Sequence, residues 1–137
     1  MIRLLLVDDQ DIFRQGLATL LSIEEDLEVI AQANNGNSAI ALAEKLQPDV
    51  ILMDIQMPIC NGVTATREIC RRYPWMRILV LTTFDDDEYI GQSLQAGAKG
   101  YLLKRKPAEE MAMAIRAVNH GYAQLSPEVA PKVFAQI

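Results

Sequence analysis

Residues 4–9 read Leu-Leu-Leu-Val-Asp-Asp, a short apolar run that ends in two acidic residues. Three further runs, at 50–53, 78–81 and 101–103, are apolar or aromatic throughout. Runs of this kind are typical of parallel strands that are covered on both faces of a sheet. A fifth run at 27–31 mixes apolar residues with a glutamate, which favours a strand at the edge of the sheet.

Between these runs lie segments whose apolar residues recur with the period of an α-helix. Pro48 and Pro74 end the second and third segments, and Pro107 fits the first helical position of the last one. Gly97 and Gly121 end the fourth and fifth segments. The predicted helices span 13–21, 39–46, 63–73, 86–96 and 107–118. Strict alternation of five strands with five helices predicts an open, doubly wound α/β fold with a parallel sheet.

The composition indicates one domain that neither crosses a membrane nor binds nucleic acid by itself. The chain has 137 residues, of which 50% are hydrophobic and 23% charged, and its formal net charge is −5. No apolar run approaches the roughly 18 residues that a membrane span needs. The apolar stretch at 4–7 is too short for a signal peptide, so we expect a cytoplasmic protein. Cys60 and Cys70 fit a reducing compartment and lack the spacing of a zinc site.

The last part of the chain has a different character. The segment 121–137 holds one glutamate and one lysine, and its pattern predicts no sixth strand. Ser126-Pro127-Glu128 resembles a helix start, but Pro131 lies too far into such a helix to be harmless. We therefore expect one domain over 1–121 and the start of a linker over 122–137.

Polar residues stand at the ends of four predicted strands. Asp8 and Asp9 follow the first strand. Asp54 follows the third, Thr82 the fourth and Lys104 the fifth. Because the carboxyl ends of parallel strands meet at one edge of a sheet, we expect these five residues to lie together, and we call this set the rim. Three close carboxylates repel one another unless a cation joins them, and Mg²⁺ prefers such oxygen ligands.

The rim is suited to hold a phosphoryl group. A divalent metal, an ammonium group and a hydroxyl group supply the positioning and the charge neutralisation that phosphoryl transfer needs. An aspartate carboxylate can act as the nucleophile and form an aspartyl phosphate. His120 is the only histidine and lies beyond the last predicted helix, so the sequence does not support a Ser-His-Asp hydrolase.

Each rim residue also has an ordinary structural interpretation. Asp9 or Asp11 can cap the first helix, and Asp54 can be a turn residue. Thr82 can be a plain strand residue, and Lys104 can be a solvated surface lysine. The functional interpretation therefore rests on the delivery of the whole set to one edge.

These motifs resemble the receiver domain of two-component response regulators over residues 1–121. The resemblance rests on Asp8-Asp9, Met53-Asp54-Ile55-Gln56-Met57-Pro58, Gly62, Thr82 and Tyr101-Leu102-Leu103-Lys104. It implies a flavodoxin-like (βα)5 fold, with a five-stranded parallel sheet in the order 2-1-3-4-5. The stretches 80–89 and 96–104 are similar to the LuxR/NarL (FixJ) subfamily, whose members carry a C-terminal helix-turn-helix domain. Residues 125–129 resemble the interdomain linker of that subfamily.

The resemblance implies that Asp54 is the phosphoryl acceptor and that the donor is a histidine of a sensor histidine kinase. Asp9 and Asp54 would bind Mg²⁺ directly, and Asp8 would act through a bound water. The backbone carbonyl of Gln56 would be a further metal ligand.

The resemblance also implies a switch. Lys104 would pair with the phosphoryl oxygens, and Thr82 would move to hydrogen-bond one of them. Tyr101 would follow Thr82 inward, because a new charge of about −2 biases a two-state element. The altered surface would then favour a homodimer. DNA would be bound only through a C-terminal domain beyond residue 137, and no membrane contact is expected.

The sequence departs from the family pattern at a few positions. Cys60 and Asn61 stand where methionine and aspartate are more usual, and Asn61 can still cap the third helix. Arg105-Lys106 follow Lys104 directly. Gln56 and Phe84 flank the expected phosphoryl site, where the family varies. None of these departures removes a rim residue.

Three other functions stay open on the sequence alone. A phosphate-independent interaction domain would have the same fold without using the rim. A Mg²⁺-dependent aspartyl phosphohydrolase of the haloacid-dehalogenase type needs a general acid two residues after the nucleophile, where this chain has Gln56. A flavodoxin-like mononucleotide binder needs a phosphate loop after the first strand, where the acidic residues would repel phosphate. We therefore expect a signalling protein that catalyses only its own phosphorylation and dephosphorylation.

Overall fold

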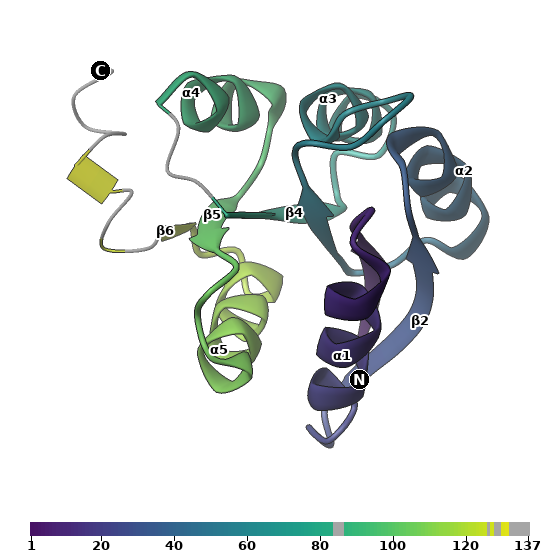
Figure 1. Cartoon of the computed structure of the whole chain (residues 1–137), viewed down its shortest axis with the longest axis vertical. Helices are drawn as coiled ribbons and strands as arrows, with labels where there is room; N and C mark the ends of the chain where they lie inside the picture. Colours follow the sequence, from purple (N-terminus) through teal and green to yellow (C-terminus); the bar gives the residue numbers. More distant parts are fainter. Residues whose placement is uncertain (84–86, 126, 128–129, 132–137) are drawn as a thin grey trace.

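The computed structural model describes residues 1–83, 87–125, 127 and 130–131, and strands alternate with helices along the chain (Figure 1). The elements are β1 Ile2–Val7, α1 Asp11–Leu21, β2 Leu27–Ala33, α2 Gly36–Leu46, β3 Val50–Asp54, α3 Gly62–Arg72, β4 Arg77–Thr82, α4 Asp87–Ala96, β5 Gly100–Leu103, α5 Ala108–Asn119 and β6 Gln124–Leu125. All the predicted strands and helices are present, although residue 86, the predicted start of the fourth helix, lies outside the described residues. Within the described ranges, no helix combines the length and the apolar character that a membrane span needs.

The strands form one parallel sheet in the order β2-β1-β3-β4-β5-β6. The order of the first five strands and the edge position of β2 confirm the predictions. The prediction of no strand after residue 121 is wrong, because residues 124–125 pair in parallel with residues 100–101 of β5. The N–H group of Gln124 also donates to the carbonyl oxygen of Lys99 at 3.0 Å. Two residues are too few to produce a periodic pattern, so only the backbone pairing reveals this strand.

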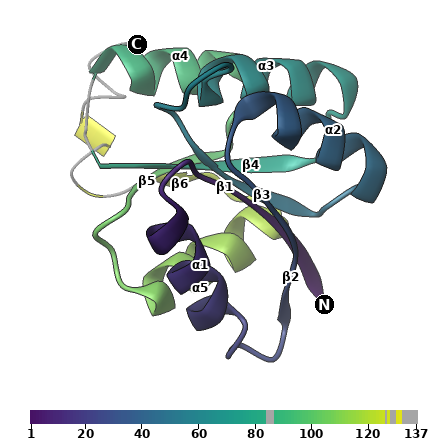
Figure 2. The same cartoon turned by 45° about the vertical axis from the view of Figure 1, so that its right-hand side comes forward.

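Helices cover both faces of the sheet. Helices α1 and α5 lie on one face, and α2, α3 and α4 lie on the other (Figures 1 and 2). Leu4 and Leu6 of β1 belong to the core under α1 and α5, whereas Leu5 and Val7 belong to the core under the three other helices. Because successive side chains of a strand point to opposite faces, both sets of positions must be apolar.

Side-chain caps begin α2 and α3. Asn35 and Asn61 each use the side-chain oxygen to accept the backbone N–H three residues later, at 2.9 Å. The cap by Asn61 confirms the expectation from the sequence. Helix α5 begins at Ala108, so Pro107 is its N-cap residue and not its first helical residue as predicted. The extended ψ angle of 152° at Pro107 is the local reason, because an N-cap residue does not have helical dihedral angles.

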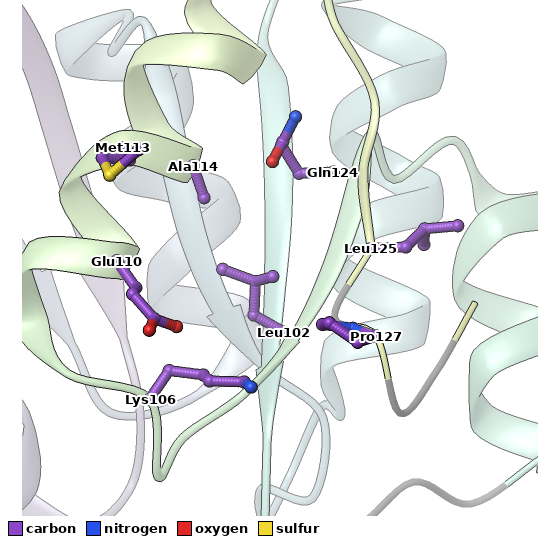
Figure 3. Close-up of a pocket in the computed structure, with 8 residues that line it drawn as sticks. All are labelled: Leu102, Lys106, Glu110, Met113, Ala114, Gln124, Leu125 and Pro127. Atoms are coloured by element: carbon purple, nitrogen blue, oxygen red, sulfur yellow. The ribbon is translucent and has the colours of Figure 1, made fainter.

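A groove of about 180 Å³ lies between α5 and the segment that contains β6 (Figure 3). Leu102 of β5 lies between its walls, with Met113 on the α5 side and Leu125 and Pro127 on the other (Figure 3). Met113 is 67% exposed, whereas Met111 is buried in the core. Helix α5 therefore packs on the sheet through one face and leaves the exposed Met113 at the groove.

Candidate functional site

The carboxyl edge of the sheet brings together the residues of the rim. Asp8 directly follows β1 and Lys104 directly follows β5, while Asp54 and Thr82 are the last residues of β3 and β4. These four residues are between 4% and 8% exposed, and Asp9 is exposed. Buried charged groups are stable only when they are paired, so the contacts among them decide the properties of the site.

The ammonium group of Lys104 has several partners in this cluster. Its Nζ atom lies 2.6 Å from Oδ2 of Asp8 and 3.4 Å from Oδ1 of Asp54. It also donates to Oε1 of Gln10 at 3.3 Å and lies 4.9 Å from the centre of the Phe13 ring. The short ion pair with Asp8 and the longer one with Asp54 leave Asp54 the less well neutralised of the two.

Asp54 is a carboxyl group that is easily protonated. Burial, and then the negative charge of Asp8, raise the pKa of Asp54 from 3.8 to about 7. Lys104 opposes this rise, as does the N–H group of Ile55, which donates to Oδ1 of Asp54 at 2.9 Å. The opposition is incomplete because one ammonium group is shared between two buried carboxyl groups. A further cation at this edge would therefore favour the ionised form of Asp54.

The acidic residues of the rim fit a divalent cation. Carboxylate oxygens of Asp8, Asp9 and Asp54 all lie within 4.8 Å of one another. These are hard oxygen ligands of the kind that Mg²⁺ prefers, and the exposed Asp9 leaves a side on which the ion can keep water. Lys104 supplies a single positive charge against three carboxyl groups, so the cluster has a net negative charge when these groups are ionised. The residues present therefore fit Mg²⁺.

The loop between β3 and α3 holds the backbone of Asp54 in place. The N–H group of Gly62 donates to the carbonyl oxygen of Ile55 at 2.8 Å. A Cβ atom at position 62 would overlap the carbonyl oxygen of Asp54, so the start of α3 can pack here only with glycine. Gln56 is exposed, and the assignment of its carbonyl group as a metal ligand stays a prediction.

The two residues predicted to act as a switch are both buried. Thr82 is joined to the site through the backbone, because its carbonyl oxygen accepts the N–H of Lys104 at 2.7 Å. Tyr101 is fully buried in β5, and its backbone pairs with Leu125 of β6. Their movement stays a prediction, and Phe84 lies outside the described residues.

The first turn of α1 completes the site, although the sequence assigned it no functional role. Gln10 is the N-cap residue but makes no side-chain cap, so the interpretation of an acidic cap for α1 is not supported. Its backbone N–H donates to Oδ1 of Asp8 at 2.8 Å. Arg14 donates from Nη1 to the carbonyl oxygen of Asp8 at 2.6 Å and from Nε to Oε1 of Gln32 at 2.9 Å. The contact between Gln10 and Lys104 joins residues 94 positions apart, so no local pattern could have revealed it.

The fold and the cluster at its edge have the arrangement of a receiver domain, and the comparison with protein families agrees. The family model for the response regulator receiver domain matches residues 4–116. The chain therefore belongs to the response regulator receiver family.

The chain is also similar to curated transcriptional regulators. It is 46% identical over 129 residues to the transcriptional regulatory protein LnrK of Bacillus subtilis (strain 168), which covers 94% of this chain and 59% of that protein. It is 45% identical over 137 residues to the transcriptional regulatory protein LiaR of the same organism, which covers 100% of this chain and 65% of that protein. The chain thus spans less than two thirds of the length of these relatives.

Solved structures of response regulators are also similar to this chain. A two-component response regulator of the LuxR family from Aurantimonas sp. SI85-9A1 matches with a TM-score of 0.91 and 31% identity, covering 98% of this chain and 96% of that one. The response regulator ChrA of a heme-sensing two-component system matches with a TM-score of 0.81 and 37% identity, covering 99% and 65% of the two chains. The relatives and the structural neighbours are thus response regulators of the LuxR/NarL type.

Proposed function

We propose that this chain is a phosphorylation-controlled receiver in which Asp54 accepts a phosphoryl group from the histidine of a sensor histidine kinase. The observation that carries the proposal is the state of Asp54: it is a buried carboxyl group with a pKa of about 7, next to Asp8 and Lys104. Strongly shifted pKa values with a specific charge partner gather at functional sites. Membership of the receiver family supports the same role.

The chemistry assigned to Asp54 is a nucleophilic displacement. An oxygen of the Asp54 carboxylate attacks the phosphorus atom, and the bond between phosphorus and the donor breaks. The donor leaves with the electron pair of that bond, and an acyl phosphate remains on Asp54. Lys104, with its Nζ atom 3.4 Å from Oδ1 of Asp54, is close enough to pair with the charged oxygens of the transferred group.

Asp9 and Asp54 would hold Mg²⁺ directly, together with the backbone carbonyl of Gln56, and Asp8 would contribute through a water molecule. When bound, the ion supplies positive charge that favours the ionised nucleophile and neutralises the transferred group. The close approach of three carboxyl groups within 4.8 Å supports this assignment.

We assign the response to the new charge to Thr82 and Tyr101. Thr82 hydrogen-bonds a phosphoryl oxygen, and Tyr101 follows it inward. The change alters the surface formed by α4, β5 and α5. This surface, or the one formed by α1 and α5, then mediates a homodimer.

The output of the full-length protein is proposed to be transcriptional. The similar proteins LnrK and LiaR are transcriptional regulatory proteins, and both are longer than this chain. Contact with DNA is therefore assigned to a further domain of the intact protein. The net charge of −5 supports this division, because it disfavours binding of DNA by the receiver itself.

Intact mass tests the proposal. The protein is incubated with acetyl phosphate, with and without Mg²⁺, beside Asp54→Ala and the matched control Asp26→Ala. Asp26 is exposed and precedes β2, away from the rim. We expect a Mg²⁺-dependent phosphoryl adduct on the wild type and on Asp26→Ala, and none on Asp54→Ala.

The other outcomes identify the alternatives. An unmodified wild type that also fails to bind Mg²⁺ would contradict the proposal and favour a phosphate-independent interaction domain. Turnover of an external phosphomonoester would instead indicate an aspartyl phosphohydrolase.

A further inference from the structure

Lys104 is held by more than the acids of the rim. Its ammonium group has three N–H donors, and three oxygen acceptors surround it. These are Asp8 at 2.6 Å, Gln10 at 3.3 Å and Asp54 at 3.4 Å. The side chain of Lys104 is only 7% exposed, so water cannot readily replace an acceptor that is lost.

A divalent cation and Lys104 compete for the same carboxyl group. Asp8 belongs to the acidic set that fits the cation, and it is also the nearest partner of Lys104. Binding of the cation therefore weakens the shortest ion pair of the ammonium group. The Gln10 acceptor is a neutral amide oxygen outside this acidic set, so it stays available to Lys104 when the cation binds.

The position of the Gln10 side chain is not explained by a role in capping α1. It does not cap α1, and the residue is exposed. The start of the helix is held through the backbone of Gln10, whose N–H donates to Oδ1 of Asp8 and whose carbonyl oxygen accepts the N–H of Arg14 at 2.9 Å. Among the described residues, the hydrogen bond of the Gln10 side chain is the one to Lys104. A substitution at position 10 that keeps the backbone intact therefore removes this acceptor selectively.

We infer that Gln10 is a positioning residue that keeps the Lys104 ammonium group at the rim when a divalent cation engages Asp8. The Phe13 ring, 4.9 Å from the same ammonium group, supports it from the helix side. Gln10 thereby sets part of the affinity for Mg²⁺ and part of the rate at which Asp54 is phosphorylated. The inference rests on the proposed function, which assigns Mg²⁺ and the phosphoryl group to this edge.

The test uses Gln10→Met, which preserves length and removes the acceptor. Gln15→Met is the matched control, because Gln15 is exposed on the same helix and away from Lys104. Gln10→Glu keeps an acceptor at the same position. Mg²⁺ alone is titrated while the amide chemical shifts of residues 8–10 are followed, urea unfolding without Mg²⁺ measures stability, and acetyl phosphate measures the rate of phosphorylation.

For Gln10→Met we expect the Kd for Mg²⁺ to rise about three- to tenfold, the range of one ordinary hydrogen bond, because the contact of 3.3 Å is long. Phosphorylation should slow by a similar factor. Urea unfolding without Mg²⁺ should show only a small loss of stability, because Asp8 and Asp54 still hold the ammonium group when the cation is absent. Gln10→Glu should bind Mg²⁺ at least as tightly as the wild type, and Gln15→Met should match the wild type in every measurement.

Two results would overturn the inference. One is an unchanged Kd for Mg²⁺ in Gln10→Met, provided that the wild type forms the phosphoryl adduct. The other is an equal loss of affinity in Gln10→Met and Gln10→Glu, because the acceptor would then be irrelevant. A wild type that forms no adduct would instead overturn the proposed function, so the two failures are distinguishable.

Discussion

At the carboxyl edge of the sheet Lys104 meets Asp8 and Asp54, while at the amino edge Arg116 of α5 meets Glu24 and Asp26. In both places one cation contacts two carboxyl groups that lie far from it in the sequence. Arg116 approaches Asp26 to 2.7 Å and Glu24 to 3.5 Å, distances similar to those at the rim. The clusters differ in burial: the side chains around Arg116 are 34–48% exposed, and those around Lys104 are 6–8% exposed.

This difference in burial gives the aspartates of the two clusters pKa shifts of opposite sign. Hydrogen bonds from Arg116 hold the pKa of Asp26 below its usual range, so the ionised pair is favoured there. At the rim, loss of solvent outweighs the attraction of Lys104, and the pKa of Asp54 rises to about 7. The cluster at Arg116 therefore joins α5 to the loop before β2, whereas the buried carboxyl groups of the rim carry unfavourable negative charge that a metal ion can neutralise. Four substitutions test this contrast.

The largest effect is expected for Lys104→Met. Without the ammonium group, the buried carboxyl groups of Asp8 and Asp54 have no cation, and such a loss costs on the order of 3 kcal/mol of unfolding free energy at pH 8. The loss should be smaller at pH 5, where Asp54 is protonated. Urea denaturation without Mg²⁺ measures both values. Lys99→Met, at an exposed lysine, is the control and should change little; equal losses at the two pH values would contradict the account.

An effect of comparable size and opposite sign is expected for Asp54→Asn. The pKa of Asp54 is 3.8 without the protein environment and about 7 in the folded state. The folded state therefore resists ionisation of Asp54, and the wild type loses stability as the pH rises from about 4 to about 7. Asparagine is neutral throughout. The variant should therefore exceed the wild type at pH 8 by on the order of 2–4 kcal/mol, and the gap should vanish near pH 4.

Asp26→Asn is the matched comparison for that experiment. Because the pKa of Asp26 is lowered in the folded state, its ionised form contributes stability above its ordinary pKa, and this contribution is lost on acidification. Asp26→Asn should therefore be less stable than the wild type at pH 8. Urea curves of both variants from pH 4 to pH 8 decide the matter, and two shifts of the same sign would refute the contrast.

The smallest effect is expected for Arg116→Met. Arg116 forms a two-pronged hydrogen bond with Asp26, at 2.7 and 2.8 Å, but the pair is exposed to solvent and salt. The loss of stability should be about a tenth to a third of that in Lys104→Met, as for surface ion pairs in general. It should shrink in 1 M NaCl, while the effect of Lys104→Met persists. Thermal unfolding at low and high salt measures this, and a salt-insensitive loss at Arg116 would argue against a screened surface pair.

The strands and helices were largely predictable because the sheet is covered on both faces. All five residues of β3, Val50–Asp54, are buried, and the run of four apolar residues before the aspartate indicates this burial in the sequence. Predicted strand ends lie within two residues of those observed. Strand β6 could not be predicted, since residues 124–125 are held by backbone pairing with β5 and need no apolar pattern.

The residues of the candidate site could be predicted from the sequence, but the contacts among them could not. Asp8, Asp54, Thr82 and Lys104 were assigned to one edge because each stands at a strand end. The role of Gln10 was not visible, because its hydrogen bond to Lys104 depends on where α1 begins relative to β5.

The α/β alternation, the parallel sheet and the residues at its carboxyl edge follow from local sequence patterns, because burial on two faces and strand polarity both act locally. Three properties depend on the folded chain: Lys104 lies closer to Asp8 than to Asp54, the pKa of Asp54 is raised to about 7, and a sixth strand pairs beside Tyr101. These properties depend on distances and solvent exclusion between segments far apart in the chain, and electrostatic energies vary steeply with both.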